Sequence, residues 1–222
     1  MKVRKCIAAS LCVALVLMTA GCSGTASNSS TGTESGTMAE ISSVSETTEM
    51  TEAITENSTE NADKSFRADN SFIDEYPSFT LTSDNLHDGV WDDVISYTDK
   101  GENRSPQLSW EPVDGAGQYL IYMSDLGAWN WIHWKSENVT ETTLPEGWAS
   151  TSEYKGPYPP NGSTHTYEIY VVAVKKPIER MKGGFDGQNP KFEECFKAAD
   201  IDIDGNEGNI ISYGKLSGTF TH

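Results

Sequence analysis

The sequence predicts a mainly β protein, an antiparallel β-sandwich with one short helix near the C-terminus, preceded by a disordered segment. All six Trp and all nine Tyr lie from residue 76 onward, so the large side chains that build a core gather there. The apolar stretches in this part are short and are separated by loops rich in Gly, Pro and Asn. Many short strands with a single helix are typical of a sandwich domain.

The charge balance excludes two classes of partner. The chain of 222 residues carries 16 Lys and Arg against 33 Asp and Glu, a formal net charge of −17. A nucleic-acid-binding protein needs a basic face to neutralise phosphates, so nucleic acid is not expected. Attachment to an anionic membrane by surface charge alone is not expected either. The composition then divides the chain into residues 1–21, 22–75 and 76–222.

Residues 1–21 are predicted to be the signal peptide of a lipoprotein. Three basic residues precede an apolar run, residues 7–18, which has the length of a signal-peptide core and is short for a membrane span. The Thr-Ala-Gly that precedes Cys22 resembles a bacterial lipobox, in which the Cys carries the lipid, including palmitate. This predicts an exported protein anchored to the cell membrane through Cys22, with its domain outside the cytoplasm. An ordinary signal peptide followed by an incidental Cys is the alternative.

Residues 22–75 are predicted to be a disordered, lipid-anchored tether. Between residues 23 and 63 there are 18 Ser and Thr, eight Asp and Glu, no Lys or Arg and no aromatic residue. Such a segment cannot bury enough apolar surface to offset its conformational entropy, and its like charges extend it. The alternative, an acidic strip that binds cations, has no spaced ligand pattern.

Residues 76–222 are predicted to form the folded domain. The segment TYEIYVVAV alternates polar and apolar residues before it becomes wholly apolar, which is typical of a strand with one buried face that runs into a core. The segment QYLIYM has the same character. We expect strands over residues 78–82, 107–110, 118–124, 133–139, 165–173 and 210–220.

One stretch, residues 190–199, has the pattern of a helix. Asn189 would cap it, with Pro190 at its first position. Phe192 and Phe196, four residues apart, would face the core.

The number of cysteines limits which disulfides and metal sites the domain can form. Cys195 is the one Cys that follows Cys22, so the exported domain is expected to hold no internal disulfide and no CxxC metal site. Because Cys195 would lie beside two phenylalanines, we expect a buried small apolar residue rather than a reactive thiol. No metal and no cofactor are expected.

An acidic loop, residues 200–205 (DIDIDG), resembles the start of an EF-hand loop. Its twelfth position would be Ile211, where calcium coordination needs a Glu. We therefore expect a solvated loop rather than a calcium site.

The candidate site surrounds two histidines. His133 lies in WNWIHW among three Trp, which are expected to line a pocket or the core rather than to stack a sugar. His165 and Tyr167 are two residues apart on a predicted strand and therefore point to one face, and the rigid GPYPP run leads into that strand. Together they would form a mostly apolar pocket with a few polar groups, as small-ligand sites are. The alternative is that both histidines are hydrogen-bonded residues at the edge of the core.

Three motifs in this order, GENRSPQLSW, SD followed by HW, and YKGPYPPNGSTHTY, resemble the phosphatidylethanolamine-binding protein family. More narrowly, they resemble its bacterial branch, often described as Raf kinase inhibitor-like. The resemblance runs from FTLTSD at residues 79–84 to GKLSGTF at residues 214–220 and covers essentially the whole domain. It implies a sandwich of antiparallel sheets with a small anion pocket at the surface.

The resemblance also implies site residues by position. The implied pocket residues are Asp125, His133, Gly156, Pro157, His165 and Tyr167. The family usually has Asp-Pro-Asp where this chain has Ser-Asp-Leu around Asp125, Cys in place of Tyr158, and Arg in place of Thr166. The missing Arg removes a cation from the neighbourhood of the pocket.

The residue types agree with a pocket for an anion. Imidazoles titrate near physiological pH and donate hydrogen bonds, and a Tyr hydroxyl adds a further donor. Asp125 would orient one imidazole or bind an ammonium group. Because the domain is itself acidic, these local donors rather than a general field would hold an anion.

We therefore expect a non-enzymatic, lipid-anchored binding protein that holds a small anionic or phosphorylated ligand of the phospholipid-headgroup type. The alternative is an inhibitor or regulator of a cell-surface protein partner, as the family name implies for some relatives. A hydrolase with a histidine as general base is a further alternative, although no obvious nucleophile stands beside the histidines.

Overall fold

The protein is described by a computed structural model over residues 67–222. The predicted signal peptide, Cys22 and the tether up to residue 66 lie outside the described residues. Within residues 67–222, none of the helices is both long enough and apolar enough to cross a membrane.

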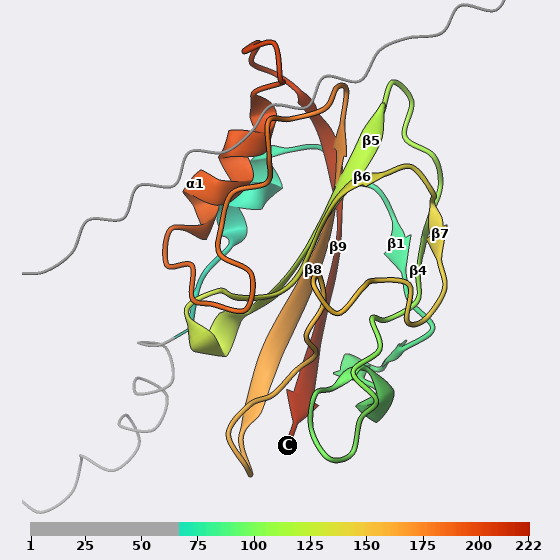
Figure 1. Cartoon of the computed structure of the whole chain (residues 1–222), viewed down its shortest axis with the longest axis vertical. Coiled ribbons are helices and arrows are strands. Elements are labelled where there is room, and N and C mark those ends of the chain that lie inside the picture. The colour runs from blue at the N-terminus through green and yellow to red at the C-terminus, as the bar shows by residue number, and fades with distance from the viewer. Residues whose placement is uncertain (1–66) are drawn as a thin grey trace, which may run out of the picture. The chain divides into compact units, whose positions relative to one another are not determined.

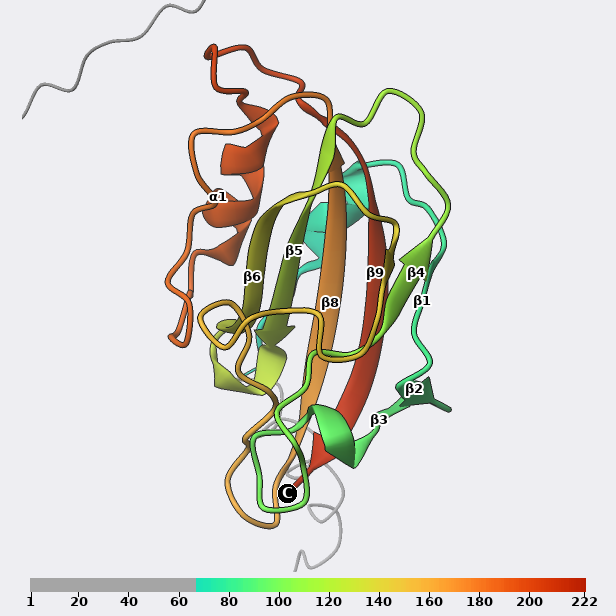
Figure 2. The same cartoon turned by 45° about the vertical axis from the view of Figure 1, so that its right-hand side comes forward.

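A six-stranded sheet forms the middle layer of this part of the chain (Figure 2). Its strands lie in the order β2-β3-β9-β8-β5-β6. They are β2 (Leu86–His87), β3 (Val90–Trp91), β9 (Ile210–Thr221), β8 (Thr164–Val174), β5 (Gln118–Asp125) and β6 (Trp131–Val139). All neighbours are antiparallel except β3 and β9, which are parallel.

A three-stranded antiparallel sheet covers one face of the large sheet (Figure 1). Its order is β1-β4-β7, with β1 (Leu81–Thr82), β4 (Leu108–Trp110) and β7 (Thr143–Leu144). Apolar side chains of both sheets form one cluster between them, with Leu108 and Leu144 from the small sheet and Ile121 and Val171 from the large one. This face-to-face arrangement is a β-sandwich.

Helices cover the other face of the large sheet (Figures 1 and 2). They include α1 (Phe192–Lys197), followed by the 3-10 turn η4 (Ala198–Asp200), and the 3-10 turn η1 (Ser71–Glu75). Because side chains alternate along a strand, Leu120 and Tyr122 of β5 enter this second cluster while their neighbours enter the first.

The predicted fold class is confirmed, and the long strands lie within two residues of their predicted bounds. Two local differences have a common cause. Ser78 makes only an isolated bridge, so β1 is shorter than predicted, and the two-residue strands β2, β3 and β7 were not predicted. Strands this short carry no periodicity of their own, because distant partners define them. Strand β8 was predicted to have one buried face and then to run into the core, and this is confirmed, because α1 and the small sheet bury both faces of its second half.

The helix is present with both phenylalanines buried, but its predicted cap is wrong. Helix α1 starts at Phe192, and its N-cap residue, Lys191, makes no side-chain capping bond. The Asn189 side chain instead closes the preceding loop: its amide nitrogen donates to the Gly184 and Gly187 carbonyls, and its oxygen accepts from Gly184 N.

Cys195 lies on α1 against the second cluster and is only half-buried, so it is less enclosed than predicted. Its pKa is raised, mainly by burial. The elevated pKa keeps the group a thiol at neutral pH, which agrees with a packing role.

The folded body begins before the predicted boundary at Tyr76. Residues 67–75, predicted to belong to the tether, include η1, and Ile73 of this turn is fully buried in the second cluster. Asn70 is also buried and donates to Asn130 Oδ1 at 3.0 Å and to Tyr170 Oη at 2.9 Å. The segment lacks a strand or helix period, so its sequence carried no sign of this docking.

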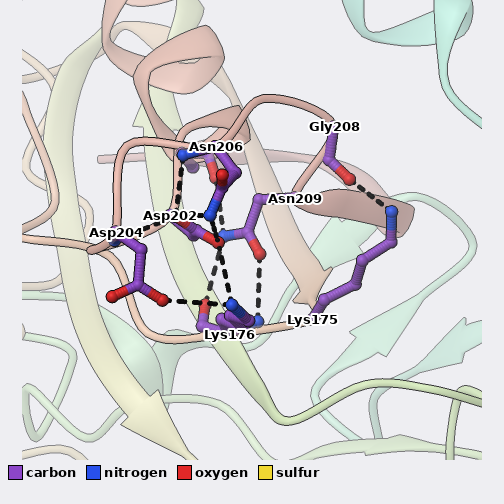
Figure 3. A network of polar contacts seen from close by, with 8 residues as sticks. Lys175, Lys176, Asp202, Asp204, Asn206, Gly208 and Asn209 are labelled. Atoms are coloured by element: carbon purple, nitrogen blue, oxygen red, sulfur yellow. Dashed lines mark hydrogen bonds and ion pairs between the residues drawn. The ribbon is translucent and has the colours of Figure 1, made fainter.

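The acidic loop is largely exposed, as predicted, but Asp202 within it is buried and bound by neighbouring amides (Figure 3). The buried Asp202 Oδ1 accepts hydrogen bonds from Asp204 N and Asn206 N, each at 2.9 Å, and Lys176 Nζ lies 3.5 Å from Oδ2. These contacts lower the pKa of Asp202 to about 2, chiefly through the bonds from Asn206. The prediction of a solvated loop was therefore wrong for Asp202, because an Asp side chain at a turn binds nearby backbone N–H groups. In the described part of the chain no cluster of three or more His, Cys, Asp or Glu could hold a metal ion.

Candidate functional site

Three adjacent strands place the candidate residues together. Asp125 at the end of β5 lies opposite Tyr167 of β8 on one side and opposite Trp131 of β6 on the other. His165 lies two residues before Tyr167 on β8, and His133 lies two residues after Trp131 on β6. The side chains of both histidines therefore share the same face of the sheet. The ring of Tyr167 lies between them, with its centroid 5.3 Å from that of His133 and 6.4 Å from that of His165.

Asp125 and His165 form an ion-pair geometry at the end of β5. His165 Nδ1 lies 2.7 Å from Asp125 Oδ2, and the other carboxylate oxygen accepts from Gly127 N at 2.8 Å. Asp125 is only 3% exposed. Both oxygens have partners, so this carboxylate orients the His165 ring and leaves its Nε2 edge for another contact.

His133 is fixed by the loop that follows β7. Its Nδ1 lies 2.7 Å from the Lys155 carbonyl and 3.0 Å from the Gly156 carbonyl. Both carbonyls are acceptors, so Nδ1 carries a proton, and in the neutral ring Nε2 is an acceptor. Burial is the main cause that lowers the pKa of His133, and the Lys155 carbonyl opposes it. His133 is therefore neutral at pH 7.

Tyr167 forms the floor behind the two imidazoles. The residue is fully buried, and its hydroxyl has no hydrogen-bond partner within residues 67–222. Burial raises its pKa, and the Asp125 carboxylate adds to the effect.

The Gly-Pro pair shapes the wall. A Cβ on Gly156 would lie 1.9 Å from the backbone oxygen of Ile95, so no larger residue fits there without movement of the chain. Gly156 N also donates to Asn103 Oδ1 at 2.8 Å. Pro157 is buried behind this wall, where its carbonyl accepts from Tyr97 N at 2.9 Å.

A cavity of about 490 Å³ opens at this place. Four of the six predicted site residues line it, namely Asp125, His133, Gly156 and His165, whereas Pro157 and Tyr167 lie behind its surface. The remaining lining residues are Gly127, Ala128, Trp129, Trp131, Lys155, Tyr158, Pro160, Asp186 and Gln188. Trp129 and Trp131 are thus wall residues, while Trp134 is fully buried in the sandwich core.

The wall near Trp129 rests on an unusual turn. Trp129 and Asn130 both have left-handed backbone conformations, with φ of 57° and 53°. The buried Asn130 side chain holds this turn, because its Oδ1 accepts from Ser124 Oγ at 2.7 Å and its Nδ2 donates to Asn70 Oδ1 at 3.1 Å. The segment 67–75 therefore supports the cavity wall through Asn70.

Sequence reasoning missed an ion pair that lines the cavity. Lys155 Nζ lies 2.8 Å from Asp186 Oδ2, and Asp186 Oδ1 accepts from Trp131 Nε1 at 3.2 Å. The two residues come from separate loops that both bind the edge of β6: Lys155 N donates to the His133 carbonyl, and Asp186 N donates to the Ile132 carbonyl. Only this shared edge brings them together, and no motif in the sequence links the two loops.

Similarity to known proteins agrees with this architecture. The family described as "Phosphatidylethanolamine-binding protein" matches residues 82–221. A UPF0098 protein from Methanothermobacter thermautotrophicus is 28% identical over 145 residues, which are 56% of this chain and 87% of that protein.

Two crystal structures of PEBP-family proteins are similar to part of this chain. YbcL of E. coli, described as a new member of the mammalian PEBP family, has a TM-score of 0.50 and 19% identity over 65% of this chain and 99% of its own. A PEBP homologue from Chlamydia trachomatis has a TM-score of 0.47 and 22% identity over 65% of this chain and 98% of its own. Since the family match spans well over half of the sequence and includes every predicted pocket residue, the chain belongs to the phosphatidylethanolamine-binding protein family.

Proposed function

We propose that this protein binds a small anionic or phosphorylated ligand, of the phospholipid-headgroup type, in the cavity lined by Asp125, His133 and His165, and that it does so without catalysis. The observation that carries the proposal is the convergence of these three side chains on one cavity, with the buried ring of Tyr167 packed against both imidazoles. A cavity of about 490 Å³ has the volume of a small-molecule site.

The polar groups support a ligand with hydrogen-bonding oxygens. His165 is oriented by Asp125, so its Nε2 edge is available to a ligand. The neutral His133 ring offers Nε2 as an acceptor for an N–H or O–H group of the ligand. Trp129, Trp131 and Tyr158 supply apolar walls.

Calorimetric titration with phosphoethanolamine tests the binding function. The wild-type chain should bind, and His165→Ala should weaken binding by about tenfold or more, because a hydrogen bond to a charged group is lost. His87→Ala is the matched control, since His87 is an exposed histidine that does not line the cavity. Absence of wild-type binding, or equal affinity in His165→Ala, would sink the proposal.

An assay with generic ester and phosphate-ester substrates tests the absence of catalysis. No turnover above background is expected for the wild type. Turnover that disappears in His133→Ala would instead support the hydrolase alternative.

The N-terminal sequence supports a proposal for where the protein acts. We propose that the protein is exported and anchored through lipid on Cys22, which places the cavity outside the cytoplasm. Cells grown with radiolabelled palmitate should label the wild type and not Cys22→Ser, and the variant should leave the membrane fraction. Equal labelling and retention of the two proteins would contradict the anchor.

A further inference from the structure

The charged groups of the cavity form two separate pairs. Asp125 pairs with His165, and Lys155 pairs with Asp186. The first pair is deeply placed, since its carboxylate is 3% exposed and is held by Gly127 N as well. In the second pair both side chains are 36% exposed, so this pair is accessible to solvent and to a ligand.

The second pair is not needed to hold its loops in place. Lys155 N donates to the His133 carbonyl at 2.8 Å, and the loop of Asp186 is bound to Ile132 through two backbone hydrogen bonds, at 2.9 and 3.0 Å. The Lys155 ammonium also lies over the Tyr97 ring, with Nζ 5.2 Å from the ring centroid. The backbone already fixes both loops, so the ammonium group can change its partner without loss of the fold.

We propose that Lys155 is the residue that binds the anionic group of the ligand, and that Asp186 competes with this group for the Lys155 ammonium. The inference rests on the proposed function, because it concerns the same cavity. A half-exposed ion pair contributes little to stability, so replacement of the Asp186 carboxylate by a ligand oxygen is inexpensive. The ammonium carries three N–H donors, of which the ion pair with Asp186 uses one.

Asp186 has a second partner that remains after the exchange. Its Oδ1 accepts from Trp131 Nε1, so the carboxylate stays at the cavity wall when Lys155 turns to a ligand. A multiply charged anion would then meet Lys155 and His165 as attractive groups but Asp186 and Asp125 as repulsive ones. Asp186 thereby lowers the affinity for a free, doubly charged phosphate and sets the specificity of the site.

The experiment measures affinity for two probes on the intact chain by titration calorimetry. Inorganic phosphate represents a free ion, and phosphoethanolamine represents a lipid head group. Lys155→Met keeps the length of the stem and should weaken binding of both probes by about tenfold or more. Lys155→Arg, which keeps the charge, should restore most of this loss.

Asp186→Asn gives a result that a merely structural role would not give. Its amide oxygen can still accept from Trp131, but the charge that competes for Lys155 is gone. Affinity for inorganic phosphate should rise by about two- to fivefold. The control is Lys182→Met, which removes a positive charge from a different cavity and should bind both probes within about twofold of the wild type.

The outcomes separate the two proposals. If His165→Ala loses affinity while Lys155→Met binds like the wild type, the role of Lys155 is overturned and the binding function stands. If Asp186→Asn binds phosphate no better than the wild type, the competition is overturned. If the wild type binds neither probe, both the proposed function and this inference fail.

Discussion

At the scale of single residues, the cavity depends on side chains whose partners leave one edge free. His133 donates from Nδ1 to two carbonyls, and His165 is held by Asp125, so each ring has a defined orientation before any ligand arrives. His133 is buried in its neutral form, and burial disfavours its charged form. The free energy of unfolding therefore depends on pH.

His133→Gln should flatten the dependence of stability on pH. The pKa of His133 lies below its ordinary value of 6.5 in the folded protein. The unfolded chain therefore binds more protons between that folded pKa and pH 6.5, and stability falls as the pH is lowered through this window. The slope from this one group is at most about 1.4 kcal/mol per pH unit. Urea unfolding between pH 7 and 5 measures it, and identical slopes in wild type and variant would contradict the assignment.

Gly127→Ala should disturb the site more than the fold. A Cβ on Gly127 would lie 2.9 Å from Cγ of His165, so the imidazole must move away from Asp125. We expect a loss of stability of about 1–3 kcal/mol together with weaker binding of phosphoethanolamine. Gly184→Ala is the matched control, because its Cβ would meet nothing closer than 4.0 Å. Unchanged affinity in Gly127→Ala would show that the Asp125–His165 geometry is not needed.

At the scale of elements, α1 is short but carries a large part of the second cluster. Phe192 lies with its ring centroid 5.3 Å from that of Tyr122 and 5.7 Å from that of Tyr170, both on strands of the large sheet. A helix of six residues is not stable by its own backbone bonds, so this aromatic packing fixes it to the sheet.

Phe192→Ala should therefore destabilise the protein strongly. The ring is fully enclosed, and truncation of such a ring costs about 3–5 kcal/mol. Glu193→Ala on the exposed face of the same helix should change stability by no more than about 0.5 kcal/mol. Chemical denaturation of both variants checks the contrast, and a small loss for Phe192→Ala would mean that the helix is dispensable.

At the scale of the whole described part, the segment 67–75 unites the second cluster with the wall of the cavity. Ile73 fills the cluster beneath the large sheet, while Asn70 reaches Asn130 in the left-handed turn beside Trp129. Residues 76–222 carry 11 basic and 22 acidic residues, and the cavity is lined by Lys155 and two histidines together with Asp125 and Asp186.

A chain shortened to residues 76–222 should be less stable than one shortened to residues 67–222. The difference should equal or exceed the cost of Ile73→Ala, which we expect to be about 2–5 kcal/mol because Ile73 is fully buried. Ile203→Ala is the control, since Ile203 is 60% exposed and should cost no more than about 0.5 kcal/mol. Equal melting temperatures of the two shortened chains would place the boundary at Tyr76 after all.

The sequence by itself determined the elements that have a local signature. The alternation along β5 and β8, and the pair of phenylalanines on α1, predicted those elements because periodicity follows directly from strand and helix geometry. The family motifs likewise named Asp125, His133, Gly156 and His165, which the structure gathers at one cavity.

Only the tertiary structure decided which residues complete the cavity and where the folded body begins. Lys155 and Asp186 meet because two loops bind the same edge of β6. Ile73 is buried because it packs on the face of the large sheet that α1 also covers. Such contacts join segments that are far apart in the chain. They form only when the sheets and loops pack together, so no local pattern of residues predicts them.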